Sequence, residues 1–184
     1  MGKTTVEKVK ETRILAELSV FVAIAAALHY LSRLYLPFFH LPEGGSITAA
    51  SLVPILWFAL RRGLRWGLEA GIVFGLVDLA LPGSYFIRHP IEILLDYPLA
   101  FGALGLAGAF KKQPVVGVGV GIAGRFVFHF ISGIVFFYTY ALEIGWNPAL
   151  YSAAYNATYL IPEFIISVVI IYTLAKRKLL DIYL

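Results

Sequence analysis

The sequence contains no cysteine and few charged residues. Without cysteine, disulfides, thiolate catalysis and cysteine-based metal sites are excluded. Charged residues make up 14% of the 184 positions, which is about half the share found in soluble domains. The P-loop pattern of ATPases and the catalytic motifs HExxH, GxSxG and CxxC are also missing, and the four histidines show no metal-ligand spacing. These absences favour a binding or transport protein over an enzyme, and they predict neither a metal nor another cofactor.

Apolar residues, in contrast, are abundant and fall into six long runs. Hydrophobic residues make up 60% of the sequence, so most of the chain is expected to lie in hydrocarbon. The runs cover residues 14–36, 46–60, 66–81, 90–110, 115–140 and 150–175. We therefore predict an all-α, multi-pass protein of the cell membrane, with six transmembrane helices in one domain spanning residues 1–184. The first run is long enough to cross the bilayer, so we expect a membrane span there rather than a cleaved signal peptide.

The basic residues predict the orientation of these helices. Twelve of the fifteen Lys and Arg residues precede the first run, follow the sixth, or lie between the second and third or the fourth and fifth. With six crossings, all four places lie on one side of the membrane. The positive-inside rule makes that side cytoplasmic, together with both termini. The net charge of +4 is explained in this way and does not require a nucleic-acid partner.

Polar residues within the runs point to a pocket in the outer half of the membrane. Asp96, His129 and Asn156 lie about 9, 16 and 9 Å from the outer ends of the last three spans, at 1.5 Å per residue. Glu43 lies in the first outer loop, beside glycines that would let this loop fold over a small molecule. Aromatic residues at similar or shallower depth are Tyr85, Tyr97, Phe137, Trp146 and Tyr151. Carboxylates, an imidazole, an amide and aromatic rings together suit a flat, cationic, heteroaromatic ligand.

Several of these residues also have a purely structural interpretation. Asp96 could form an intramembrane salt bridge with Arg125, which lies deeper and is expected to be structural. His129 and Asn156 could tie helices together, and the aromatic residues Trp146 and Tyr151 could belong to an interfacial belt. Two further acidic residues near the inner half, Glu69 and Glu163, are interpreted as packing or coupling residues, and Asp78 has no assigned role.

The first span carries a small-residue face. Ala23 and Ala27 are four residues apart and therefore lie on the same side of a helix. Small residues at this spacing let a second helix approach closely. The face could pack against another helix of this chain, or it could dock a partner membrane subunit.

Short motifs along nearly the whole chain carry a family resemblance. They are EGGSIT at 43–48, HPI at 89–91, LDYPLAF at 95–101, RF at 125–126, HFISG at 129–133, YN at 155–156 and YLIPE at 159–163. In this order and spacing, the sequence resembles the thiamine-specific substrate-binding subunits, or S components, of energy-coupling factor (ECF) transporters. The resemblance implies a subunit that binds thiamine near the outer face for uptake, and an ABC-type module, a membrane scaffold with two ATPase subunits, that hydrolyses ATP.

The resemblance also implies residue roles. It matches Asp96 and Tyr97 to an acid followed by Tyr, His129 to a histidine of the fifth helix, and the pair Tyr151 and Asn156 to the sixth. Glu43 matches an acid of the first outer loop, and Ala23 and Ala27 match the small-residue motif that contacts the scaffold. The complete expected binding set is Glu43, Tyr85, Asp96, Tyr97, His129, Gly133, Phe137, Trp146, Tyr151 and Asn156.

Two alternatives remain open. The chain could be an S component for another vitamin, such as riboflavin; an anionic vitamin would find only Arg33 and Arg88 near the outer face. It could instead be a small membrane enzyme that uses Asp96, Arg125 and His129, although these residues match no known catalytic spacing.

Overall fold

The computed structural model describes residues 4–41, 44–82 and 89–179. Within these ranges the fold is helical, and His40 and Ser46 form an isolated β-bridge. The elements are α1 (Thr5–Tyr35), η1 (Pro37–Phe39), α2 (Leu52–Arg62), α3 (Leu64–Ala80), α4 (Pro90–Leu94), η3 (Leu95–Leu99), α5 (Ala100–Ala103), η4 (Leu104–Phe110), α6 (Pro114–Phe136), α7 (Tyr138–Glu143) and α8 (Pro148–Lys176). The prediction of an all-α protein is confirmed for the described residues.

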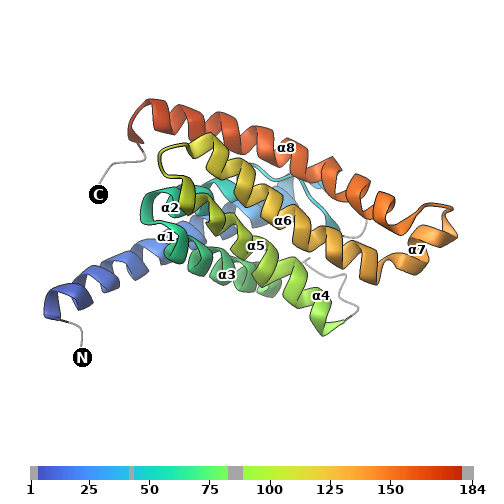
Figure 1. Cartoon of the computed structure of the whole chain (residues 1–184), viewed down its shortest axis with the longest axis horizontal. Coiled ribbons are helices and arrows are strands. Elements are labelled where there is room, and N and C mark those ends of the chain that lie inside the picture. Colours follow the sequence, from blue (N-terminus) through green and yellow to red (C-terminus); the bar gives the residue numbers. More distant parts are fainter. Residues whose placement is uncertain (1–3, 42–43, 83–88, 180–184) are drawn as a thin grey trace.

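Four helices of the described chain are long and apolar enough to cross a membrane. They are Val6–Tyr35, Pro90–Phe110, Pro114–Phe136 and Pro148–Lys176. The second of these, which we call the fourth membrane helix after its predicted place, consists of α4, η3, α5 and η4 in succession. In Figure 1, α1 begins and α8 ends at the same end of the bundle, and α7 lies at the opposite end.

Two helices are too short to cross a bilayer core of ~30 Å unaided. Helix α2 has 11 residues and α3 has 17, which correspond to about 16 and 26 Å. The predicted second span begins at Ser46, whereas α2 begins at Leu52 because residues 46–51 are not helical. The predicted fifth span, 115–140, is interrupted where α6 ends at Phe136 and α7 begins at Tyr138.

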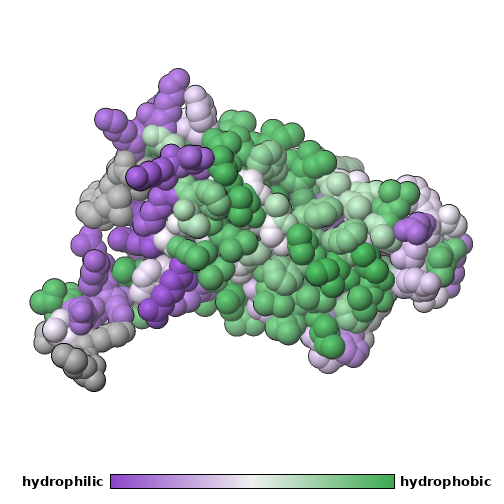
Figure 2. All heavy atoms as spheres, in the orientation of Figure 1, coloured by the Kyte–Doolittle hydropathy of each residue, from purple (hydrophilic) through white to green (hydrophobic). Residues whose placement is uncertain are grey.

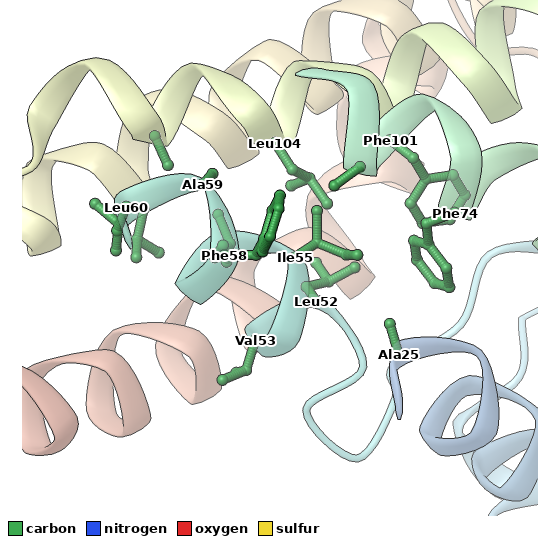
Figure 3. Packing of buried hydrophobic residues seen from close by; sticks show 14 of the residues in the cluster. Ala25, Leu52, Val53, Ile55, Phe58, Ala59, Leu60, Phe74, Phe101 and Leu104 are labelled. Atoms are coloured by element: carbon green, nitrogen blue, oxygen red, sulfur yellow. The ribbon is translucent and has the colours of Figure 1, made fainter. Parts of the chain in front are cut away.

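Helix α2 lies inside the bundle and not at its surface. Nine of its eleven residues are buried. Figure 3 shows Ile55 and Phe58 of α2 close to Leu104 of the fourth membrane helix. At one end of this cluster the rings of Phe74 and Phe101 meet edge to face, with 4.7 Å between centroids. This core fixes α2, α3 and the fourth membrane helix relative to one another.

Glycines bring α3 unusually close to the fourth membrane helix. A Cβ atom at Gly71 would collide with the backbone carbonyl of Phe101, and one at Gly75 would collide with that of Tyr97. Because the two glycines are four residues apart, they present one smooth stripe to the neighbouring helix. The close approach places Asp78, one turn beyond Gly75, beside the segment that carries Asp96.

The surface is divided into an apolar middle and polar ends. Figure 2 shows hydrophobic residues over the middle of the visible face. Hydrophilic residues gather at the end where α1 begins and α8 ends, with a smaller group near α7. An apolar band between two polar ends is the surface expected of a membrane protein.

Candidate functional site

A cavity lies among α1, the segment before α2, α3, the fourth membrane helix, α6 and α8. Its lining residues are His29, Arg33, Gly44, Gly45, Ser46, Asp78, Glu92, Asp96, Tyr97, Phe101, Arg125, His129, Ser132, Gly133, Phe137, Tyr151, Ser152, Tyr155, Asn156 and Tyr159. Charged, polar and aromatic side chains thus converge from six parts of the chain.

One wall of the cavity is a single face of α6 with Asp96 opposite it. The Asp96 carboxylate lies 2.8 Å from His129 Nδ1 through Oδ1, and its Oδ2 accepts a hydrogen bond of 2.7 Å from Ser132 Oγ. Arg125 Nε donates to His129 Nε2 over 3.1 Å, and its guanidinium carbon lies 4.1 Å from the centroid of the Phe101 ring. Instead of the salt bridge considered from the sequence, these contacts place His129 between Asp96 and Arg125.

A local distortion accounts for the position of Asp96. Residues Leu95–Leu99 form a π-helical turn that contains Pro98. Proline has no amide hydrogen and its ring clashes with the preceding turn of an α-helix, so a widened turn accommodates it. Turns of this kind recur at functional sites, and here the widened turn contains both Asp96 and Tyr97.

A second charged group occupies the wall formed by α1 and α3. Arg33 Nη2 lies 3.2 and 3.3 Å from the two oxygens of Asp78, and His29 Nδ1 lies 3.6 Å from Asp78 Oδ1. Both Asp78 and His29 are buried. No role was predicted for Asp78 from the sequence, and His29 was not expected in the site. The i, i+4 spacing of His29 and Arg33 within an apolar helix was the available signal.

Helix α8 contributes an aromatic wall. Tyr151 stacks near Tyr155 at 6.0 Å between centroids, and Tyr155 meets Tyr159 edge to face at 5.9 Å. Asn156 lies on the same helix, where its amide donates to Ser152 O over 2.9 Å and its carbonyl oxygen accepts from the Tyr159 hydroxyl. These bonds of Asn156 stay within α8, so they are not the tie between helices that the sequence allowed.

The segment before α2 is fastened to α8 and α1 by backbone hydrogen bonds. Gly45 N donates to the Tyr155 hydroxyl over 2.8 Å, and Ala49 N donates to Ser32 Oγ over 2.9 Å. Thr48 donates from both its backbone N and its Oγ1 to Glu163 Oε1. Irregular backbone inside a membrane protein needs such partners. Glu163, interpreted from the sequence as a packing or coupling residue, supplies one of them.

The structure brings seven of the ten expected binding residues to the cavity. They are Asp96, Tyr97, His129, Gly133, Phe137, Tyr151 and Asn156. Glu43 and Tyr85 lie outside the described residues. Trp146 follows α7, is 46% exposed and is not among the lining residues of the described chain.

The small-residue face of α1 points away from the cavity. Ala23 and Ala27 are exposed, whereas Ala25 is fully buried. Packing against another helix of the described chain, which was one of the two roles considered, therefore does not explain this face.

Comparison with known proteins gives concordant matches. A family model described as thiamine transporter protein (Thia_YuaJ) matches residues 15–181. The chain is 35% identical to the thiamine transporter ThiT of Bacillus subtilis, over 85% of this chain and 87% of that protein. It is 28% identical to ThiT of Lacticaseibacillus paracasei, over 88% and 86%. The solved structure of ThiT from Listeria monocytogenes superposes with a TM-score of 0.75 at 26% identity, covering 91% of this chain and 96% of that one.

Proposed function

The chain belongs to the thiamine transporter family, and we propose that its cavity binds thiamine from the outer side of the cell membrane for uptake. Membership of the family makes the protein a transporter and not an enzyme. The proposal therefore concerns where the vitamin is bound and which residues bind it.

The charge of the cavity is the observation that carries this proposal. Three carboxylates line it, from Asp78, Glu92 and Asp96, against the two guanidinium groups of Arg33 and Arg125. With both histidines uncharged, the described lining has one negative charge more than positive. A site withdrawn from water binds a cation best when it supplies compensating negative charge. The permanently charged thiazolium ring of thiamine meets that requirement.

The remaining lining residues suit the two rings of the vitamin. Tyr97, Phe137 and Tyr151 offer ring faces, which attract a cation through the aromatic quadrupole. His129 and Asn156 would hydrogen-bond the aminopyrimidine or hydroxyethyl end. Glu43, which the sequence predicts in the first outer loop, would add a further carboxylate beside that of Asp96 near the thiazolium.

We further propose six membrane crossings with both termini in the cytoplasm. Helices α2 and α3 would form the second and third crossings, with residues 46–51 completing the second at membrane depth. This is supported by the shared location of the start of α1 and the end of α8 in Figure 1 and by the distribution of Lys and Arg.

The energising partners are likewise a proposal. We propose that the exposed face of Ala23 and Ala27 docks an ECF membrane scaffold, and that two ATPase subunits bound to the scaffold hydrolyse ATP. The exposure of both alanines supports the docking, and the lack of a P-loop in this sequence agrees with ATP hydrolysis by other subunits.

Calorimetry of the purified chain tests the proposed function. Thiamine is expected to bind with a stoichiometry of one, whereas riboflavin and biotin, at the same concentrations, release no binding heat. Saturable binding of riboflavin or biotin without binding of thiamine would refute the proposal.

A further inference from the structure

Arg125 lines the cavity, lies over the ring of Phe101 and reaches two further residues of the site through one row of contacts. It lies four residues before His129 on α6, so the two side chains share one face of the helix. Arg125 Nε donates to His129 Nε2 over 3.1 Å, and His129 Nδ1 lies 2.8 Å from Asp96 Oδ1. The three groups form an unbroken row from a buried guanidinium to a carboxylate.

The direction of each hydrogen bond in this row follows from the donor. A guanidinium group has five N–H donors and no acceptor. His129 Nε2 must therefore accept with its lone pair, which leaves the ring proton on Nδ1. The Nδ1–H group in turn donates to Asp96 Oδ1, because a carboxylate only accepts. The second oxygen, Oδ2, accepts from Ser132 Oγ, so the orientation of the Asp96 carboxylate is fixed from both sides.

We propose that Arg125 is a positioning residue for ligand binding, which holds His129 as the uncharged Nδ1–H tautomer and thereby keeps the charge of Asp96 available for a cationic ligand. This inference rests on the proposed function of the cavity as a thiamine site. It assigns Arg125 a role beyond the structural one expected from the sequence.

The mechanism works by blocking a second proton on His129. A proton on Nε2 would face the N–H of Arg125 across 3.1 Å, donor against donor and cation against cation. The other groups that face His129 are Asp96 from η3 and the ring of Tyr159 from α8, whose centroid is 6.0 Å away. The Tyr159 hydroxyl donates to Asn156 Oδ1, so the hydrogen-bond partners of the His129 ring nitrogens in the described chain are Asp96 and Arg125.

The remaining charged groups of the cavity lie on other elements. They are Arg33 and Asp78, which pair with each other, and Glu92, whose Oε2 accepts from the backbone of His89 over 3.2 Å. If His129 became a cation beside Asp96, the pair would be neutral overall and a positive ligand would meet a positive imidazolium. The guanidinium of Arg125 opposes this near pH 6.5, where an ordinary histidine changes charge.

The first experiment compares pH profiles of thiamine binding for the full chain and for Arg125→Met between pH 8 and pH 6. Methionine keeps an unbranched side chain against Phe101 but removes the donors and the charge. The Kd of the unmodified chain is expected to change by much less than twofold, and that of Arg125→Met is expected to rise about fourfold as the pH falls from 8 to 6, as an ordinary histidine titrates. Titration of thiamine itself affects both proteins alike, so it cancels in the ratio of their Kd values at each pH.

A double variant identifies the titrating group. In Arg125→Met with His129→Asn, an amide replaces the imidazole and cannot change charge, so the additional pH dependence is expected to disappear. Equal pH profiles for the unmodified chain and Arg125→Met, or a pH dependence that persists in the double variant, would overturn the inference.

A second experiment uses neither ligand nor an Arg125 variant. Nitrogen NMR of the unmodified, histidine-labelled protein in detergent reports the tautomer of each of its four histidines, and His129→Asn identifies the signal of His129. We expect the Nδ1–H form throughout pH 8 to 6. The Nε2–H or doubly protonated form at pH 7 would refute the role of Arg125, whatever the cavity binds. Correct tautomer without thiamine binding would instead refute the proposed function alone.

Discussion

Replacing Asp96 by Asn tests the electrostatic basis of ligand binding. The substitution preserves the size of the side chain and an oxygen that can accept from His129, but it removes the negative charge. The carboxylate makes hydrogen bonds of 2.8 and 2.7 Å to His129 and Ser132, and asparagine can retain both if the Ser132 hydroxyl rotates to accept. Folding is therefore expected to survive, and the loss of charge is the main change.

The size of the effect follows from the setting of Asp96. Removing one member of a buried ion pair costs on the order of 3–5 kcal/mol. The Asp96 side chain retains 22% exposure, so its desolvation is completed only when a ligand enters. The lower end of the range, about 3 kcal/mol, is therefore appropriate, which corresponds to about a hundredfold in Kd. We predict that thiamine binds to Asp96→Asn at least tenfold more weakly than to the unmodified chain.

The assay is calorimetry with two ligands, thiamine and a neutral analogue that lacks the thiazolium charge. The neutral analogue is expected to bind to both proteins with similar affinity, because it gains little from the carboxylate. Circular dichroism and gel filtration confirm that the variant is folded. A folded Asp96→Asn protein that binds thiamine as tightly as the unmodified chain would refute the reasoning and make Glu43 the leading counter-ion.

Further predictions concern topology, partnership and packing. Because the chain has no cysteine, Lys112→Cys is expected to resist a membrane-impermeant thiol reagent in intact cells, and Leu142→Cys to react; labelling of residue 112 from outside would contradict the proposed orientation. Ala23→Trp is expected to abolish uptake by cells but to leave thiamine binding by the purified chain unchanged, because the ring blocks only the docking face; normal co-purification of the scaffold would argue against this. Gly133→Ala would place a Cβ against Ser152 and lower the free energy of unfolding by about 1–3 kcal/mol, measured by denaturation in detergent; an unchanged stability would show that α6 and α8 adjust freely.

The sequence was sufficient to predict features that depend on local periodicity and depth. Long apolar runs predicted α1, α6 and α8, and depth along three helices brought Asp96, His129 and Asn156 together. Depth in the membrane did not indicate, however, whether a side chain points into the cavity. Trp146 is aromatic and lies at a depth suited to an outer site, but its side chain is exposed after α7.

Features that depend on distant partners could not be predicted. The run at 46–60 is mostly apolar, with Ser46, Thr48 and Ser51 near its start, and this composition alone did not show that α2 begins only at Leu52. The preceding backbone is non-helical because Glu163, Tyr155 and Ser32 satisfy its donors from other helices. Similarly, Asp78 has a role only beside Arg33, which is 45 positions away in the chain.

The π-helical turn at Leu95–Leu99 has a consequence for chain length. A π turn contains about one residue more than an α turn, which shifts the helical phase of everything beyond it by about 100°. Glu92 before the turn and Phe101 after it both line the cavity, although the helix between them is interrupted by the π-helical turn. Deleting a single residue within this turn would therefore rotate one half of the helix away from the cavity, even though every residue outside the turn keeps its side chain. Natural length variation and engineered insertions should be tolerated in the turn around Gly145, where the chain is exposed, and excluded from these five positions.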